Sequence, residues 1–190
     1  MSIKPIEIKG NWDKGFVLDM HVLKSTPKSE NVYGYMEYDT VRTELGELVF
    51  QLKYRNMYNN IHKILDMIKP FLDDFAELKE VNVVLPVPPS KVRDYQPVEE
   101  LARTIADYLG IACTGDVLEN ISIQQSKDMD KSTKCLKGSI VKKLDAKKPH
   151  TALLIDDLYC TGNTITECVS ALRTDPLLNK IYVLIMTKTR

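Results

Sequence analysis

The chain has 190 residues, of which 44% are hydrophobic, enough for one compact domain with a sizeable core. Lys and Arg total 26, as do Asp and Glu, so the zero net charge gives no global case for binding nucleic acid or an anionic membrane. The four cysteines include no C-x-x-C pair and have no His at metal-ligand spacing, which argues against a structural zinc site. Because the first residues show no targeting pattern and no apolar run could cross a bilayer, we expect a cytoplasmic protein with reduced thiols.

The first 43 residues carry β-strand patterns. Residues 16–24 and 32–42 alternate or are rich in aromatic side chains, and the polar stretch 25–31 separates them. This arrangement predicts a β-hairpin with a longish loop. We therefore expect a hairpin appendage over 1–43 and an α/β domain over 44–190, within a single compact molecule. The tyrosines of the hairpin are expected to pack rather than to stack on bases.

From Glu44 the apolar residues change to a helical period. One helical face carries Leu45, Leu48, Val49 and Leu52. A second helix is expected over 59–77, with Pro70 as a kink or a break. The cations Lys53 and Arg55 could point at a site, but cations are common at helix ends, and the second interpretation is favoured.

The rest of the chain alternates between strands and helices. Buried strands are expected over 81–86, 151–155 and 181–186, a weaker one near 116–119, and helices over 97–109 and 164–172. Between them, 121–148 is polar and lysine-rich, typical of a long functional loop. This order predicts an α/β fold with a mostly parallel, twisted sheet flanked by helices. Ligands of such sheets bind beyond the carboxyl ends of the strands, here after Leu85 and Ile155.

The segment 155–164 carries the clearest chemistry. A buried strand delivers Asp156 and Asp157 to the sheet edge, and four residues later the turn 161–164 (TGNT) opens a helix. Free backbone N–H groups, hydroxyls and the positive helix end suit a phosphate, and Gly162 lets the backbone approach it closely. The carboxylates would instead accept hydrogen bonds from sugar hydroxyls or hold a hydrated Mg²⁺. The alternative is a solvated strand end with a simple N-cap, but the elements occurring together favour the phosphate loop.

This segment resembles the signature of type I phosphoribosyltransferases, an apolar strand, two acids and then Thr-Gly-x-Thr. The wider resemblance, over about residues 45–190, is to the ComF family of phosphoribosyltransferase-like proteins associated with competence for DNA uptake. The stretches that carry it are 52–55 (LKYR), 85–88 (LPVP), 93–96 (RDYQ) and 136–138 (LKG), preceded by 124–126 (QQS). The chain departs from that family in lacking the four-cysteine zinc module and in altering the residues at Asp94 and Gln96-Pro97, so no base-contacting role is assigned there.

The resemblance implies roles for particular residues. Asp156 and Asp157 would be the catalytic acids that bind the ribose hydroxyls of phosphoribosyl pyrophosphate (PRPP) and organise Mg²⁺, which is held through PRPP and water rather than directly. The residues implied to cradle the 5′-phosphate are Cys160, Thr161, Gly162, Asn163 and Thr164. Those implied to bind pyrophosphate are Val87, Pro88, Pro89, Ser90, Lys91 and Arg93, the last two being the cations. In the segment 121–148, a candidate lid, Lys137 is our first choice to reach the pyrophosphate, and most other lysines are expected to be solvated.

The resemblance predicts a PRPP-binding enzyme, a glycosyltransferase that moves a phosphoribosyl group to an unidentified nitrogenous acceptor and releases pyrophosphate. Two alternatives remain open: a non-catalytic PRPP or nucleotide sensor, and an accessory protein of DNA uptake whose lysine-rich segment contacts a single strand. Zero net charge disfavours a dedicated nucleic-acid binder, and no membrane association is expected. Whether the protein forms a homodimer is left open.

Overall fold

A six-stranded sheet forms the centre of the protein in the computed structural model, which describes residues 3–91, 93–121 and 139–189. The sheet is made, in spatial order, of β1 (Ile6–Ile8), β2 (Lys14–Met20), β10 (Leu178–Lys188), β9 (His150–Tyr159), β5 (Val83–Pro86) and β6 (Ala112–Cys113). All neighbouring pairs are parallel except β1 with β2. The expected α/β fold with a mostly parallel sheet is therefore confirmed.

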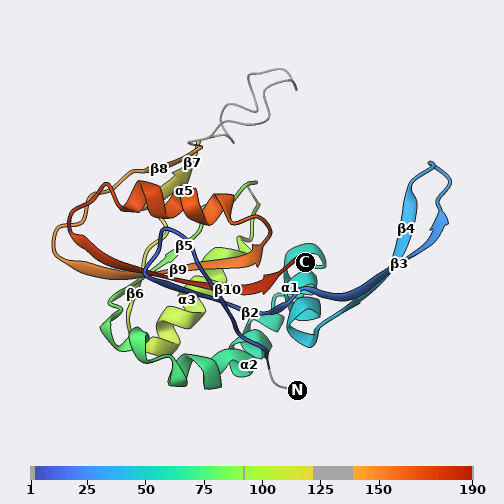
Figure 1. The fold of residues 1–190 in the computed structure, drawn as a ribbon, viewed down its shortest axis with the longest axis horizontal. Coiled ribbons are helices and arrows are strands. Elements are labelled where there is room, and N and C mark those ends of the chain that lie inside the picture. Colours follow the sequence, from blue (N-terminus) through green and yellow to red (C-terminus); the bar gives the residue numbers. More distant parts are fainter. Residues whose placement is uncertain (1–2, 92, 122–138, 190) are drawn as a thin grey trace.

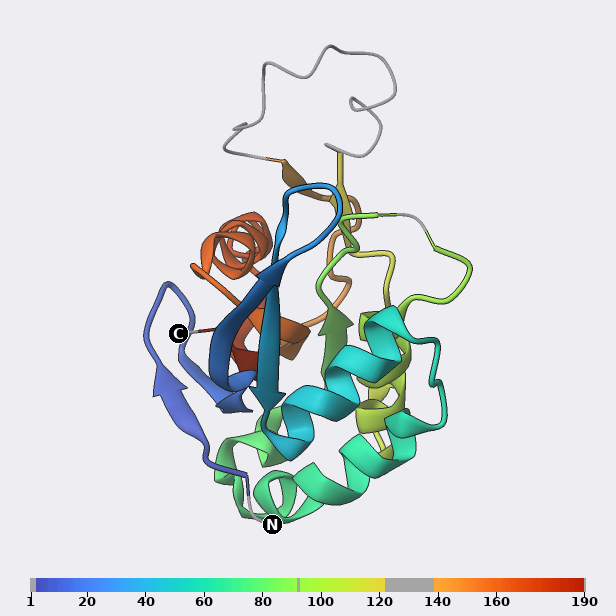
Figure 2. The ribbon, with the colours of Figure 1, turned by 90° about the vertical axis from the view of Figure 1, so that its right-hand side faces the viewer.

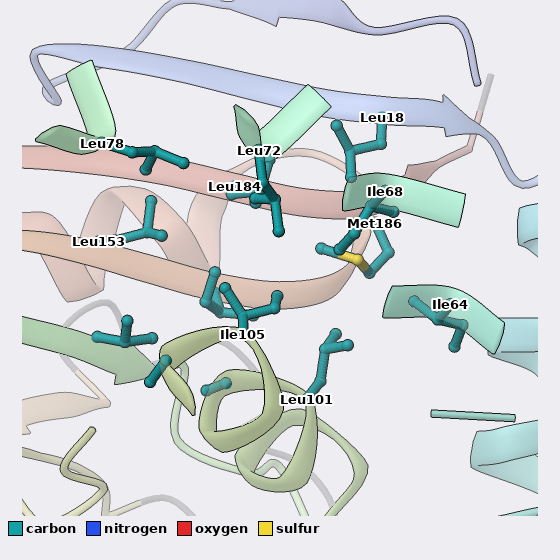
Figure 3. Packing of buried hydrophobic residues seen from close by; sticks show 14 of the residues in the cluster. Leu18, Ile64, Ile68, Leu72, Leu78, Leu101, Ile105, Leu153, Leu184 and Met186 are labelled. Atoms are coloured by element: carbon teal, nitrogen blue, oxygen red, sulfur yellow. The ribbon is translucent and has the colours of Figure 1, made fainter. Parts of the chain in front are cut away.

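Helices cover both faces of this sheet (Figures 1 and 2). On one face lie α1 (Glu44–Tyr54), α2 (Asn60–Asp74) and α3 (Pro97–Leu109), and on the other lies α5 (Asn163–Leu172). Figure 3 shows the core of the first face, where Leu153 and Leu184 of the sheet meet Ile68 and Ile105 of the helices. Because each central strand is covered twice, its residues are apolar in a continuous run rather than in alternation.

The N-terminal hairpin is formed by different residues from those expected. Residues 14–20, which include most of the first expected hairpin strand, belong to the central sheet as β2, parallel to β10. The hairpin pairs β3 (Val22–Glu30) with β4 (Met36–Arg42) instead. The reason is burial: Val17 and Leu18 are fully buried, each against a different helical layer, so this run needs a central position. The hairpin tyrosines do not pack as expected, because Tyr33, Tyr35 and Tyr38 are exposed.

The other elements follow the sequence pattern with smaller differences. Helix α3 has the expected bounds, and Gly110 ends it at a φ of 68°. Helix α2 continues through Pro70 to Asp74, and the 3₁₀ helix η1 (Ala76–Glu80) follows it, so the proline does not break the helix. The weak strand near 116–119 is β7 (Leu118–Asn120), which pairs with β8 (Ile140–Lys142) outside the central sheet.

Helix α1 is held close to the chain between β2 and β3. Its N-cap, Thr43, accepts a hydrogen bond from the Gly46 N–H at 2.9 Å and donates one to the Met20 carbonyl at 2.6 Å. A Cβ added at Gly46 would overlap the carbonyl oxygen of His21. Glycine at this buried helical position therefore sets how closely α1 approaches the sheet.

We expect Gly46→Ala to destabilise the fold by about 1–3 kcal/mol, because the added methyl group has to push α1 away from His21. A glycine-to-alanine change inside a helix normally stabilises it by roughly 0.5–1 kcal/mol, so the expected sign is reversed. Denaturant unfolding measures the difference. The exposed helical substitution Lys63→Ala is the control and should change stability by less than about 0.5 kcal/mol. A Gly46→Ala protein at least as stable as the native one would contradict this account.

Candidate active site

A pocket of about 230 Å³ lies at the carboxyl ends of the parallel strands. Three segments line it: the last turn of α1, the stretch from the end of β5 to the start of α3, and the end of β9 with the turn into α5. Of the expected site residues, those that border this one pocket are Val87, Pro88, Pro89, Ser90, Lys91, Arg93, Asp156, Asp157, Cys160 and Thr164. Segments more than 30 residues apart in the sequence thus meet where the order of strands and helices predicts a ligand.

The two adjacent acids point to opposite faces of the sheet. Strand β9 runs on to Tyr159, so Asp156 and Asp157 lie within the strand rather than after it. Side chains alternate along a strand, and Ile155 packs on the α1–α3 face while Leu154 packs on the α5 face. Asp157 therefore faces α1, and Asp156 faces α5. The pair is not a single carboxylate cluster but two acids in different surroundings.

Asp157 is buried and paired with a cation. The Nζ atom of Lys53 lies 3.0 Å from Oδ1 and 2.7 Å from Oδ2 of Asp157. Burial alone would lower the pKa of Lys53, but the charge and hydrogen bond of Asp157 outweigh it and raise this pKa above its usual value. Lys53 does lie in the last turn of α1, as the favoured interpretation expects, but its side chain also borders the pocket. Local sequence carried no signal for this pairing, because its partner is 104 residues away.

Asp156 is in a setting that disfavours its charge. Burial, and then the neighbouring charge of Asp157, raise the pKa of Asp156 to about 7. Lys53 and a hydrogen bond from the Asp157 N–H, 2.8 Å from Oδ1, oppose this shift only in part. Asp156 thus remains a carboxyl group that can accept or release a proton near neutral pH and whose oxygens are not bound by a cation of the described residues.

The turn between β9 and α5 has the geometry expected of an anion-binding turn. Gly162 adopts a φ of 82°, a conformation that favours glycine. A Cβ there would also lie only 2.5 Å from the Tyr159 hydroxyl, so both the backbone conformation and the lack of space disfavour a side chain. Helix α5 begins directly after it, which leaves the first N–H groups of the helix without partners inside the helix. Cys160 and Thr164 border the pocket. Thr161, Gly162 and Asn163 belong to the same turn but do not line the pocket.

The stretch from the end of β5 to α3 adds positive charge. The Val87 N–H donates to the Ile155 carbonyl at 2.9 Å, which fixes the start of this stretch beside β9. Gln96 holds its far end, because its Nε2 atom lies 3.2 Å from the carbonyl of Lys91 and 3.3 Å from that of Arg93. Arg93 also donates to the Lys53 carbonyl at 3.4 Å, so the two cation-bearing segments are joined. Sequence analysis did not identify Gln96 as the residue that fixes this loop.

A second cavity of about 270 Å³ adjoins the first. The two share Lys53, Arg93 and Pro97. The remaining residues that line it are Leu52, Asn56, Tyr58, Asp94 and Tyr95. The rings of Tyr58 and Tyr95 are in contact at a centroid distance of 4.0 Å, with their planes tilted by 34°. This cavity offers aromatic surface together with one amide and one carboxylate.

A direct metal site is not apparent in the described part of the chain, where no group of three or more His, Cys, Asp or Glu residues converges. The donors present suit Mg²⁺ bound mainly through phosphates and water, since Asp156 can contribute oxygen while Asp157 is engaged by Lys53. Lys137 lies outside the described residues, so its expected role stays a prediction. No helix of the described residues is long and apolar enough to cross a membrane.

No protein-family model and no curated protein matches the chain. Among the solved structures that match, the UMP synthase of Leishmania donovani is 13% identical with a TM-score of 0.43, over 88% of this chain and 29% of that one. An adenine phosphoribosyltransferase is 12% identical with a TM-score of 0.46, over 87% of this chain and 85% of that one. The chain thus spans less than a third of the UMP synthase. At these identities and TM-scores neither likeness by itself assigns a function.

We expect neutral substitutions of the two acids to have opposite effects on stability. An aspartate in an unfolded chain has a pKa of about 4, whereas that of Asp156 is raised to about 7 in the folded protein. The stability contributed by protonated Asp156 is therefore present below about pH 4 and is lost as the pH rises through 7. Asp156→Asn should exceed the native protein in stability by about 1–2 kcal/mol at pH 8, allowing for exposure to the pocket, and by much less at pH 5.

Asp157→Asn should instead destabilise the protein by about 1–3 kcal/mol at pH 8, because it leaves Lys53 charged, largely buried and without its partner. Thermal unfolding of both variants and the native protein at the two pH values measures these differences. Two variants of equal stability would show that the acids do not differ in the way described.

Proposed function

We propose that the chain is a ComF-like phosphoribosyltransferase that binds PRPP and transfers its phosphoribosyl group to a nitrogenous acceptor, releasing pyrophosphate. The observation that carries this proposal is the convergence, around one pocket, of the acids at the end of β9, the turn before α5 and the cations Lys91 and Arg93. The turn before α5 suits the 5′-phosphate of PRPP, and the carboxylates can accept hydrogen bonds from the ribose hydroxyls. The cations of the loop after β5 suit the pyrophosphate.

In this assignment each group acts on one part of the ligand. The turn 160–164 would receive the 5′-phosphate through backbone N–H groups and hydroxyls, and Asp156 would accept hydrogen bonds from the ribose. Loss of pyrophosphate leaves positive charge on the sugar, which the ionised acids stabilise, and negative charge on the leaving group, which Lys91 and Arg93 stabilise. Mg²⁺, when bound with PRPP, supplies further charge neutralisation at the pyrophosphate. Closure over the site would exclude water and prevent hydrolysis.

We place the acceptor in the adjoining cavity of about 270 Å³. A planar heterocycle would stack on the exposed face of the Tyr58–Tyr95 pair, and Asp94 would accept a hydrogen bond from one of its N–H groups. Because Lys53, Arg93 and Pro97 line both cavities, an acceptor there would adjoin the ribose.

The first test is binding. PRPP with Mg²⁺ at about 100 times its dissociation constant should stabilise the protein by about 2.7 kcal/mol, a rise of roughly 5–10 °C in melting temperature. The double substitution of Asp156 and Asp157 by Asn should abolish the rise. The matched control substitutes Asn for Asp66 and Asp74, both exposed on α2, and should keep it. Each variant is compared with its own ligand-free melting temperature. Native protein that shows no rise would contradict PRPP binding.

The second test is turnover. Pyrophosphate release, followed with a panel of nitrogenous bases, should occur with at least one base and disappear in the double Asn variant. Asp94→Ala should raise the KM for that base severalfold while leaving the PRPP-induced melting shift unchanged. Binding of PRPP without pyrophosphate release from any base would favour the non-catalytic sensor. The ion pair with Lys53 supports this alternative, because it occupies the charge of Asp157.

A further inference from the structure

The β3–β4 hairpin is a projecting arm whose surface is unusually apolar. Figure 1 shows it leaving the body beyond the C-terminal end of β10. Twelve large hydrophobic side chains are exposed in the described part of the chain, and seven of them lie within 22–42. Those at the tip are the most exposed: Val32 at 94%, Tyr33 at 81% and Tyr35 at 72%. A concentration of this kind marks a surface that another molecule covers, since a two-stranded ribbon alone is marginally stable in water.

A groove of about 590 Å³ lies at the base of the same arm. One wall is β4, with Tyr38 and Arg42, and the other is formed by α1 and the residues after it, with Phe50, Arg55 and Met57. The guanidinium of Arg42 stacks on the Phe50 ring at 3.7 Å, which fixes the floor of the groove. Tyr38 is 58% exposed and Met57 is 47% exposed, so apolar surface is open here as well.

The tip and the groove of one chain cannot reach each other. Strand β3 has nine residues and therefore spans about 30 Å at roughly 3.3 Å per residue. Its ladder with β4 keeps the arm extended, and the main contact of the arm with the body is at its base, between β4 and α1. The groove of the same chain therefore cannot cover the tip, and no other described residue covers it, since Val32 and Tyr33 are almost fully exposed.

We infer that the tip is covered by a second copy of the chain, in a two-fold dimer in which the arms exchange. The tip of each arm, residues 31–35, would insert between β4 and α1 of the other copy. An isologous contact of this kind covers the tips and the grooves of both copies at once, whereas a different protein bound to either feature would leave the other open.

Charge favours this occupant. Glu30 and Glu37 flank the tip, and Arg55 lies on the outer wall of the groove; none of the three has an ion-pair partner among the described residues. In the exchanged dimer these opposite charges meet at the rim of the contact. Each copy would contribute its five tip residues and the nine residues that line its groove, a contact below the 20–30 residues per side of a standard interface, so the dimer is expected to depend on protein concentration.

The decisive experiment uses two variants and their mixture. The tip variant carries Tyr33→Ser and Tyr35→Ser, and the groove variant carries Arg55→Glu and Met57→Asp. All four positions are exposed, so both variants should keep the native melting temperature. Light scattering coupled to size exclusion, over roughly 1–100 µM protein, should give native protein at twice its 21.7 kDa mass and each variant alone as a monomer.

Mixing the two variants should restore a dimer that neither forms alone. The intact tip of the groove variant meets the intact groove of the tip variant, so one of the two contacts is complete in the mixed pair and neither is complete in either variant alone. Leu144→Ser, which removes an exposed apolar side chain elsewhere, should leave the native dimer unchanged. Should either variant melt early, the single change Tyr33→Ser replaces the tip variant and should weaken the dimer at least tenfold.

Three results would each overturn the inference: a native protein that is monomeric throughout the range, a tip variant that dimerises as the native protein does, or a mixture that stays monomeric. The first would leave the arm to a different protein. The second would place the dimer contact elsewhere on the surface. The third would show that tip and groove do not contact each other. None of these depends on whether the pocket binds PRPP.

Discussion

The ion pair between Lys53 and Asp157 is the contact on which the candidate site depends. It joins the last turn of α1 to the central strand β9, with the Nζ atom 2.7 Å from one carboxylate oxygen and 3.0 Å from the other. Pairs removed from water cost free energy to assemble, but leaving one member buried and alone costs more. The other end of α1 is held by its cap on the Met20 carbonyl and by the close approach of Gly46 to His21. The helix is therefore fixed at both ends, and Arg93, which donates to the Lys53 carbonyl, is positioned by the same helix.

This pairing also separates two residues that look equivalent in the sequence. The carboxylate of Asp157 forms an ion pair with Lys53, which ties α1 to β9. Asp156 lies on the opposite face, where burial and the neighbouring charge of Asp157 raise its pKa. A carboxyl group whose pKa is raised by burial and a like charge is a candidate for a functional role, and this setting is the reason Asp156 is assigned to the ligand in the proposed function. A structural role alone would have favoured a neutral residue there. The alternation of side chains along β9 thus puts the two acids in different surroundings, with Asp157 paired to Lys53 and Asp156 without a cation partner among the described residues.

The parts that sequence analysis predicted were those set by local pattern. Continuous apolar runs identified β5, β9 and β10, the helical period identified α1 and α3, and adjacent acids followed by a Thr-Gly turn located the pocket. What failed was long-range. Strand β2 pairs with β10, more than 160 residues away, whereas local reasoning joined it to the nearest β-rich run. Lys53 lies at a helix end as expected, but its contact with Asp157 was missed for the same reason, since nothing within a few turns of it reveals that partner. Whether the chain belongs to the ComF family stays a prediction, and so does the role of Lys137.

The misplaced hairpin strand also explains the character of the arm. Because the buried residues Val17 and Leu18 belong to the central sheet, the first strand of the arm is formed by residues 22–30. Most side chains of this strand are polar and cannot build a core. The tyrosines of the other strand and of the tip are then left uncovered by the described residues, although the sequence suggested that they pack. The core and the pocket are complete without the arm, since no residue of 22–42 lines the pocket or belongs to either buried core cluster. Its apolar side chains therefore add nothing to the fold that a polar ribbon would not, and a contact with another molecule is the reason the structure offers for their presence.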